Sequence, residues 1–317
     1  MDRPVVLITC HHTLRNFEQY KQRFCDANVE FILPKPKGQQ FDEDDMKQML
    51  PKCDVAICGD DALNCSVLEA GAKGRTKLVI RWGIGTDSVD KKAAKELGIE
   101  VRNTPGVFGE EVADAAWALI LLLARQYHLM HQSVVNQQWL KIEGRSITGL
   151  TLGVIGLGSI GQAILRRGVG FGTKNIGYDP YPISNDALSS VQTEQVVLDV
   201  LIERSDIVVL ACNLTKDNYH LIDEQILQKN KPGCFIVNVA RGPLVDNQAL
   251  AEALKSGLVA GAGLDVFEFE PLPRDDPIRS APNCVFGTHN GSNTKDAVQR
   301  VNDITIQMAL QALKTGA

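Results

Sequence analysis

Short apolar runs alternate along the chain with longer stretches in which apolar residues recur every three or four positions. The runs predict buried strands, and the spaced pattern predicts amphipathic helices. The first series of expected strands is VVLIT (5–9), VEFIL (29–33), DVAIC (54–58), KLVIR (77–81) and IEVRN (99–103). Between the last two lies DSVDKKAAKELG, a predicted helix that Asp87 caps and Gly98 ends. Regular alternation of strand and helix predicts a parallel sheet covered by helices.

A second series of strands follows the predicted helix EEVADAAWALILLLARQ. Its members are TLGVIG (151–156), NIGYD (175–179), DIVVLAC (206–212), CFIVNVAR (234–241), VAGAGLDVF (259–267) and CVFGT (284–288). They predict a second doubly wound parallel sheet, so the fold class is α/β with two such domains. No low-complexity tract separates the two series, and we expect a short hinge near residues 102–105.

The helix between the two series is apolar on nearly every face from Val112 to Ala124. A surface helix of a monomer keeps a polar face, so we expect this helix to be buried on two sides. We therefore predict a homodimer whose interface contains the 110–128 region. The last helix carries a stripe that we interpret as facing the core: Val298, Val301, Ile304 and Met308.

Composition narrows the classes of function. The length of 317 residues favours two domains, and a net charge of -5 without a basic tract argues against nucleic acid as a partner. The longest apolar run, residues 115–124, is too short to cross a bilayer, and the N-terminus lacks the layout of a signal peptide. Eight cysteines without Cys-x-x-Cys spacing indicate reduced thiols rather than a metal site. We expect a cytoplasmic protein that binds neither membrane nor metal.

The segment GVIGLGSIGQAI places Gly156, Gly158 and Gly161 in G-x-G-x-x-G order between an expected strand and an expected helix. This pattern allows a tight turn, a close approach of the backbone to a diphosphate, and close packing of the helix on the strand. Asp179 ends the next strand, where its carboxylate can accept hydrogen bonds from ribose hydroxyls and repel a 2′-phosphate. The pattern predicts NAD rather than NADP as the cofactor.

Three other predicted strands end in residues that can do chemistry. Arg241, Asp265 and His289 follow apolar runs whose carboxyl ends share one edge of a parallel sheet. Glu270 could reach His289, orient its ring and fix which nitrogen faces the substrate. Arg241 offers a planar fork for a carboxylate. These parts suit hydride transfer between NADH and a 2-keto acid, with His289 as the proton donor.

The chain resembles the D-isomer-specific 2-hydroxyacid dehydrogenases. The matching stretches are RWGIGTDSVD, NTPGVFGEEVADAAWALILLLAR, LGVIGLGSIGQAI, GYDPY, VNVARGPLVD, GLDVFEFEPLP and the His289 segment, in the order of the family. The resemblance implies interconversion of a small D-2-hydroxy acid and its 2-keto acid, with Arg241, Glu270 and His289 as the catalytic residues. It places the substrate carboxylate near Gly83, Ile84 and Gly85, as well as at Arg241. The cofactor-binding residues that we expect are Gly156, Gly158, Ser159, Ile160, Gly161, Asp179, Asn213, Ala240 and Asp265.

The resemblance also implies a discontinuous architecture. A Rossmann NAD domain, residues 102–289, is expected as an insertion in a flavodoxin-like substrate domain formed by residues 1–101 and the C-terminal helix region 290–317. Substrate would bind in a cleft between the two domains, and hinge closure would exclude water.

The sequence departs from the family pattern at two places. Thr288 stands where many members have proline before the histidine. Cys58, followed by Asp60 and Asp61, stands where phosphoglycerate dehydrogenases of the animal type carry an arginine, and the two carboxylates would repel a phosphorylated acid. Other candidates for substrate specificity are His11, His12, Arg15, Arg81 and Trp82, although a surface role is the more ordinary interpretation of Arg15.

Two alternatives remain open from the sequence. The co-repressors that resemble this family keep the same catalytic residues and act through NAD-linked assembly with peptide partners, and a shared fold does not separate them from an enzyme. A related NAD enzyme could also act on another small anion, such as phosphite.

Overall fold

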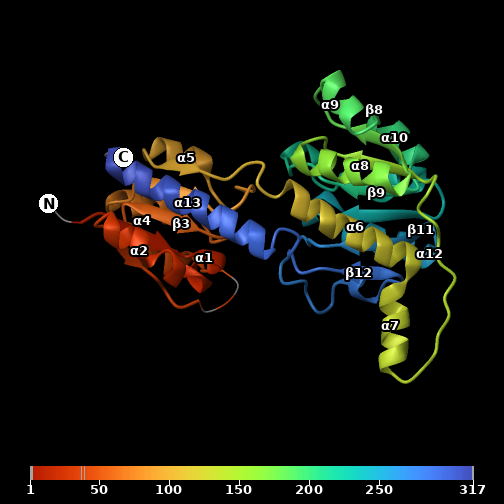
Figure 1. The fold of residues 1–317 in the computed structure, drawn as a ribbon, viewed down its shortest axis with the longest axis horizontal. Coiled ribbons are helices and arrows are strands. Elements are labelled where there is room, and N and C mark those ends of the chain that lie inside the picture. The colour runs from red at the N-terminus through yellow and green to blue at the C-terminus, as the bar shows by residue number, and fades with distance from the viewer. Residues whose placement is uncertain (1–2, 37, 39, 316–317) are drawn as a thin grey trace. The chain divides into compact units, whose positions relative to one another are not determined.

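The computed structural model describes residues 3–36, 38 and 40–315. The chain divides into two compact units. Unit 1 contains residues 1–107 and 294–317, and unit 2 contains residues 108–293. The sequence-based boundaries were 101/102 and 289/290, and the assignment of substrate and NAD to the two parts stays a prediction. Each unit is an α/β structure built on its own sheet (Figure 1).

Unit 1 has a five-stranded parallel sheet in the order β2-β1-β3-β4-β5. Its strands are β1 (Val5–Ile8), β2 (Glu30–Ile32), β3 (Val55–Cys58), β4 (Leu78–Arg81) and β5 (Glu100–Arg102). This is the flavodoxin-like order, in which the direction of winding reverses between β1 and β3. Its helices are α1 (His11–Arg15), α2 (Lys21–Asp26), α3 (Glu43–Met49), α4 (Cys65–Lys73), α5 (Lys91–Glu96) and α13 (Lys295–Thr315).

Two expectations about the helices of unit 1 are wrong. The cap of α5 is Asp90, whose side chain accepts from the backbone N–H of Ala93, so Asp87 is not the capping residue. Gly98 does follow the end of that helix, with φ of +72°. On α13 only Val301 of the predicted stripe is fully buried, and the buried face consists mainly of small or polar residues: Ala297, Val301, Asn302, Thr305, Ile306, Ala309 and Ala312. Small residues let a helix lie close to its neighbours, so the larger apolar side chains are left at the margin of the contact.

Unit 2 has a seven-stranded parallel sheet in the order β12-β11-β10-β9-β6-β7-β8. Its strands are β6 (Thr151–Ile155), β7 (Lys174–Tyr178), β8 (Thr193–Gln195), β9 (Ile207–Leu210), β10 (Cys234–Asn238), β11 (Val259–Leu264) and β12 (Cys284–Phe286). The winding reverses between β6 and β9, as in a dinucleotide-binding sheet. The fold class predicted from the sequence is confirmed by the two sheets.

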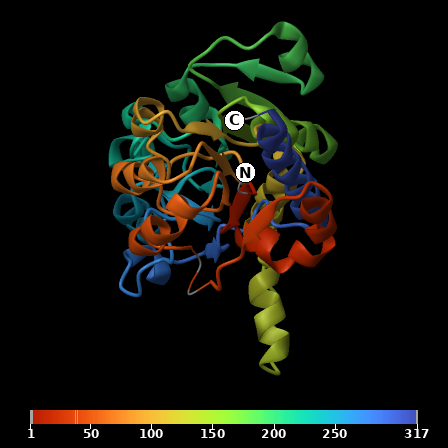
Figure 2. The ribbon, with the colours of Figure 1, turned by 90° about the vertical axis from the view of Figure 1, so that its left-hand side faces the viewer.

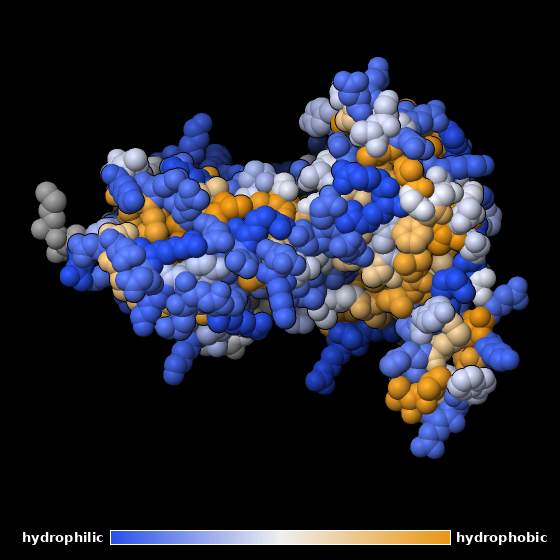
Figure 3. Space-filling model, viewed as in Figure 1, coloured by the Kyte–Doolittle hydropathy of each residue, from blue (hydrophilic) through white to orange (hydrophobic). Residues whose placement is uncertain are grey.

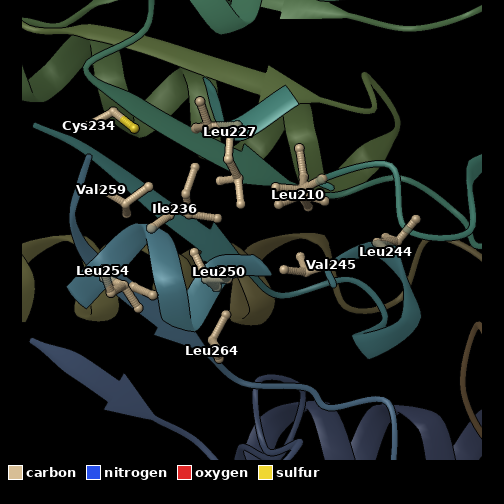
Figure 4. Close-up of a cluster of buried hydrophobic side chains, with 14 of the residues drawn as sticks. Leu210, Leu227, Cys234, Ile236, Leu244, Val245, Leu250, Leu254, Val259 and Leu264 are labelled. Atoms are coloured by element: carbon tan, nitrogen blue, oxygen red, sulfur yellow. The ribbon is translucent and has the colours of Figure 1, made fainter. Parts of the chain in front are cut away.

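The helices of unit 2 cover both faces of its sheet. They are α6 (Gly109–Arg125), α7 (Tyr127–Val135), α8 (Ser159–Phe171), α9 (Asn185–Ser190), α10 (Leu198–Arg204), α11 (Glu224–Lys229) and α12 (Asn247–Ser256). On one side, Leu250 and Leu254 of α12 pack on strand residues such as Ile236 and Leu264 (Figure 4). This cluster is fully buried and anchors the strands whose carboxyl ends carry the candidate site.

Helix α6 is covered largely by its own unit. Trp117 stacks on Phe171 with ring centroids 4.2 Å apart and donates from Nε1 to the carbonyl of Ile164 at 3.0 Å. Gly263 of β11 lets the helix approach the sheet, because a Cβ there would lie 2.9 Å from Cβ of Leu119. Much of the predicted two-sided burial therefore comes from within the chain. The apolar pattern of α6 is therefore explained mainly by contacts within unit 2, and it gives little support for a dimer by itself.

Helix α7 extends away from the body of unit 2 (Figures 1 and 2). Large apolar side chains are exposed on α7 and on the segment that follows it: Tyr127, Leu129, Val134, Val135, Trp139 and Leu140. Hydrophobic residues gather on the α6 side of unit 2 and again on α7 (Figure 3). In the described part of the chain, no helix is both long and apolar enough to span a bilayer.

Candidate active site

The glycine turn joins β6 to α8 at the point where the unit 2 sheet reverses its winding. Gly156 has φ of +97°, and a Cβ there would lie 2.6 Å from the backbone of Cys212. A Cβ on Gly161 would lie 1.9 Å from the carbonyl oxygen of Gly156. A Cβ on Gly158 would meet nothing within 4 Å, so this glycine borders open space. The first and third glycines are required by the fold, and the second leaves room for a ligand.

The first turn of α8 offers backbone donors beside that open space. Gly158 is the N-cap and supplies no side-chain acceptor, while Ser159 and Ile160 form the start of the helix. The N–H groups at a helix N-terminus lack partners within the helix and attract anions. The turn therefore fits the diphosphate of NAD.

Asp179 follows β7 and lies next to the glycine turn. Its Oδ2 accepts from the backbone N–H of Leu157 at 2.9 Å, and its Oδ1 accepts from that of Tyr181 at 3.1 Å. Each carboxylate oxygen can accept more than one hydrogen bond, so the group retains capacity for ribose hydroxyls. The predicted segment DPYPIS thus places its carboxylate where the adenosine end of a dinucleotide is expected.

Asn213 and Ala240 follow the neighbouring strands β9 and β10. The carbonyl of Asn213 accepts from the side chain of Asn218 at 2.8 Å. The N–H of Ala240 donates to Oδ1 of Asn238 at 3.0 Å, and Nδ2 of Asn238 donates to the carbonyl of Arg241 at 2.8 Å. The buried Asn238 side chain therefore shapes the turn that carries Arg241. The sequence analysis did not identify Asn238, although a polar residue inside the apolar run CFIVNVAR could have indicated a special role.

His289 and Glu270 lie in contact. Nδ1 of His289 is 2.7 Å from Oε2 of Glu270, and Oε1 of Glu270 accepts from the backbone N–H of Phe267 at 2.9 Å. The carboxylate is thus held by the backbone of its own loop while it orients the imidazole. Both side chains are partly exposed, so they are accessible to a small molecule. A carboxylate on one ring nitrogen fixes the orientation from which the other nitrogen can exchange a proton.

Asp265 holds the loop that carries His289. Its two carboxylate oxygens accept from the N–H groups of Asn290 at 3.0 Å and Gly291 at 2.8 Å, and its carbonyl accepts from the N–H of His289 at 2.6 Å. His289 has φ of +54°, a left-handed conformation that these contacts stabilise. These hydrogen bonds make Asp265 a residue that positions His289, and its predicted role in cofactor binding stays a prediction.

Arg241 follows β10 on the same edge of the unit 2 sheet. One guanidinium nitrogen donates to the carbonyl of Ala240 at 2.7 Å, and the side chain is partly exposed. Gly242 comes next, and a Cβ there would lie 1.8 Å from the backbone of Phe267. The turn after β10 therefore packs directly on the loop that leads to Glu270, which brings these parts of the predicted site together.

The predicted carboxylate-binding segment lies in unit 1, directly after β4. Gly83 has φ of +123°, its N–H donates to Oγ1 of Thr104 at 3.1 Å, and its carbonyl accepts from the N–H of Thr104 at 3.0 Å. The carbonyl of Ile84 accepts from Nδ2 of Asn103 at 2.7 Å. These contacts hold the backbone at Gly83 and Ile84. Its role in substrate binding stays a prediction.

Comparison with known proteins decides the family. A family model described as D-isomer specific 2-hydroxyacid dehydrogenase, NAD binding domain, matches residues 117–291, more than half of the chain. The chain belongs to this family. It is an NAD-dependent D-2-hydroxyacid dehydrogenase, and its two-sheet α/β structure is the fold of the family.

Several members of the family are similar over most of their length. Glyoxylate reductase of Korarchaeum cryptofilum is 38% identical over 262 residues, which cover 81% of this chain and 78% of the relative. Hydroxypyruvate reductase of Thermotoga maritima is 38% identical over 270 residues, covering 83% and 86%. The apo-structure of D-lactate dehydrogenase from Escherichia coli superposes with a TM-score of 0.82 at 32% identity, covering 99% and 97% of the two chains.

Proposed function

We propose that this dehydrogenase interconverts small 2-keto acids of the glyoxylate and hydroxypyruvate type and their D-2-hydroxy acids, with His289 and Glu270 as the acid–base pair. The observation that carries the proposal is the 2.7 Å contact between Nδ1 of His289 and the Glu270 carboxylate. The pair stands on the same sheet edge as the glycine turn. The names of the similar glyoxylate and hydroxypyruvate reductases support the choice of substrates.

In the reducing direction, each residue has one task. Arg241 binds the carboxylate of the 2-keto acid through paired N–H donors. NADH held at the glycine turn would supply the hydride for the carbonyl carbon. His289 donates a proton to the carbonyl oxygen as the negative charge develops there, and Glu270 keeps the ring oriented during the transfer. Asp265 holds the His289 loop in place through backbone hydrogen bonds.

The test is NADH oxidation at 340 nm with hydroxypyruvate, glyoxylate, pyruvate, phenylpyruvate and 3-phosphohydroxypyruvate, with NADPH in parallel. We expect turnover of hydroxypyruvate or glyoxylate and a preference for NADH, since Asp179 disfavours a 2′-phosphate. Turnover of none of these acids by a protein that still binds NADH would overturn the proposal.

We propose a homodimer that covers the exposed apolar side chains of α7 and the following segment together with the 110–128 region, because several large exposed apolar side chains on one segment are typical of an interface. All eight cysteines are free thiols, which supports a cytoplasmic location.

A further inference from the structure

The carboxyl edge of the unit 1 sheet holds a cluster of charged and aromatic side chains. This edge contains the reversal of winding between β1 and β3, the position at which doubly wound sheets bind ligands. His12 follows β1, Asp60 follows β3, and Arg81 ends β4. The His12 ring stacks on Trp82 with centroids 4.5 Å apart and an interplanar angle of 26°. Nothing in the proposed reaction yet uses these four side chains.

Arg81 is the buried charged residue of the cluster. Only 9% of its side chain is exposed, against 58% for Asp60. Its guanidinium donates to the carboxylate of Asp60 and to the carbonyl of Trp82. Within the part of the chain that the structure describes, Nε of Arg81 is buried without an acceptor. Arg81 is therefore a cation with spare donor capacity, and Asp60 supplies its counter-charge from the solvent side.

Besides Asp60 and Arg81, the ionisable residues at this edge of unit 1 include His12, Arg15 and Asp61. Burial and the nearby Arg15 lower the pKa of His12, which favours the neutral form of its imidazole. Arg15 itself is exposed at the end of α1. Asp61 was expected to repel anions together with Asp60, but it is buried and turned away. Its carboxylate accepts from the Thr9 hydroxyl and from backbone N–H groups, so Asp60 alone faces outward.

We propose that Asp60 is a specificity-determining residue: it neutralises Arg81 and thereby makes the enzyme reject 2-keto acids that carry a second anionic group, such as a distal carboxylate or phosphate. Specificity of this kind comes from a repulsive element directed against the wrong substrate as much as from contacts with the right one. The inference rests on the proposed function, because only an enzyme that turns over 2-keto acids can discriminate among them. Without the Asp60 charge, Arg81 becomes an uncompensated cation that attracts a distal anion.

The test compares Asp60→Asn with the wild type on two 2-keto acids of equal chain length, oxaloacetate and 2-oxobutyrate. They differ in a distal carboxylate in place of a methyl group. We expect the ratio of kcat/KM for oxaloacetate to that for 2-oxobutyrate to rise at least tenfold, which corresponds to about 1.4 kcal/mol. The gain should shrink as NaCl is added, since an electrostatic attraction is screened by salt. A loosened fold alone would change neither the ratio nor its salt dependence in this way.

Three controls keep the outcome interpretable. Asp44→Asn removes one exposed carboxylate from α3 of the same unit and should leave the ratio unchanged. The double variant Asp60→Asn/Arg81→Gln should lose the gain, because the freed cation is then absent. Asp60→Ser, which keeps a hydroxyl acceptor for Arg81, replaces Asp60→Asn if that variant does not fold.

Each outcome separates this inference from the proposed function. A wild-type enzyme that reduces oxaloacetate as efficiently as 2-oxobutyrate overturns the inference without any variant. An unchanged ratio in a folded Asp60 variant also overturns it, while the reduction of glyoxylate or hydroxypyruvate by the wild type still upholds the proposed function. Wild-type failure on every 2-keto acid would instead defeat the proposed function itself.

Discussion

Asn302 on α13 joins three parts of unit 1, and its replacement by leucine should destabilise that unit strongly. Its side-chain oxygen accepts from Oγ1 of Thr13 at 2.7 Å and from Nε1 of Trp82 at 2.8 Å. Asn302 and Thr13 are fully buried, and Trp82 is 4% exposed. Leucine has a similar size but cannot accept a hydrogen bond. The change therefore removes the acceptor from two buried donors at once.

The magnitude follows from those two donors. A buried donor that loses its partner costs about 1–3 kcal/mol. The Thr13 hydroxyl can rotate toward another acceptor, whereas the indole N–H of Trp82 is fixed in direction. We therefore expect Asn302→Leu to lower the free energy of unfolding by about 3 kcal/mol, a large part of the about 5–15 kcal/mol available to a domain.

Urea unfolding followed by far-UV circular dichroism measures this loss. If the two units unfold in separate transitions, only the transition of unit 1 should move. Gln307→Leu makes the same kind of change at an exposed position of the same helix and should shift stability by less than about 0.5 kcal/mol. In a cycle with Thr13→Val, the two losses should add to more than the loss of the double variant, because each variant removes one side of the same contact. A loss below about 0.5 kcal/mol for Asn302→Leu would refute the reasoning.

Three further predictions concern the site and the assembly. His289→Ala should keep NADH binding, measured by fluorescence titration, and lose about 10²- to 10⁴-fold in kcat, the usual effect of a positioned acid; an unchanged kcat would remove His289 from the mechanism. Asp179→Ala should weaken NADH binding and reduce the preference over NADPH, since the ribose acceptor and the repulsion of a 2′-phosphate are both lost; an unaltered preference in steady-state kinetics would contradict the ribose assignment. Light scattering at micromolar concentration should give twice the mass of the chain, and Val135→Lys on the exposed surface of α7 should shift the mass toward that of the monomer, whereas a wild-type monomer would exclude the proposed dimer.

The strands could be predicted from the sequence because apolar runs of this length have few other ways to be buried. Strand β8 was missed, since Thr193–Gln195 is polar and pairs with β7 at the edge of the sheet, where only one side needs a partner. The cap of α5 was misplaced by three residues because Asp87 and Asp90 are both good capping residues, and only the backbone geometry distinguishes them. The prediction for the core face of α13 was wrong at three of its four residues, because small and polar residues form most of the buried face.

In the candidate active site, too, some features could be predicted from the sequence and others depend on the folded structure. The glycine turn was predictable, because its spacing is dictated by steric contacts such as that between Gly161 and the carbonyl of Gly156. The expected contact of His289 with Glu270 is confirmed, because the two side chains are within hydrogen-bond distance. The catalytic roles of the two residues stay predictions. The opposite orientations of Asp60 and Asp61 could not be predicted, since neighbouring carboxylates look alike in a sequence. Two of the partners that hold Asp61 inward, Thr9 and Phe41, are far from it along the chain.

The contact of Thr13 with Asn302 joins residues that are 289 positions apart, and the whole of unit 2 lies between them in the sequence. The ribosome synthesises the first segment of unit 1 before unit 2 and the last segment, with α13, after it. The strands of unit 1 therefore lack α13 until unit 2 has been synthesised. Unit 2 is one continuous segment and can become compact first, which brings the two parts of unit 1 within reach of each other and lowers the entropy lost when they meet. The insertion thus helps the two parts of unit 1 to assemble. Helix α13 packs on β3 and β4, so the faces of these strands stay uncovered, and open to aggregation, until α13 has been made.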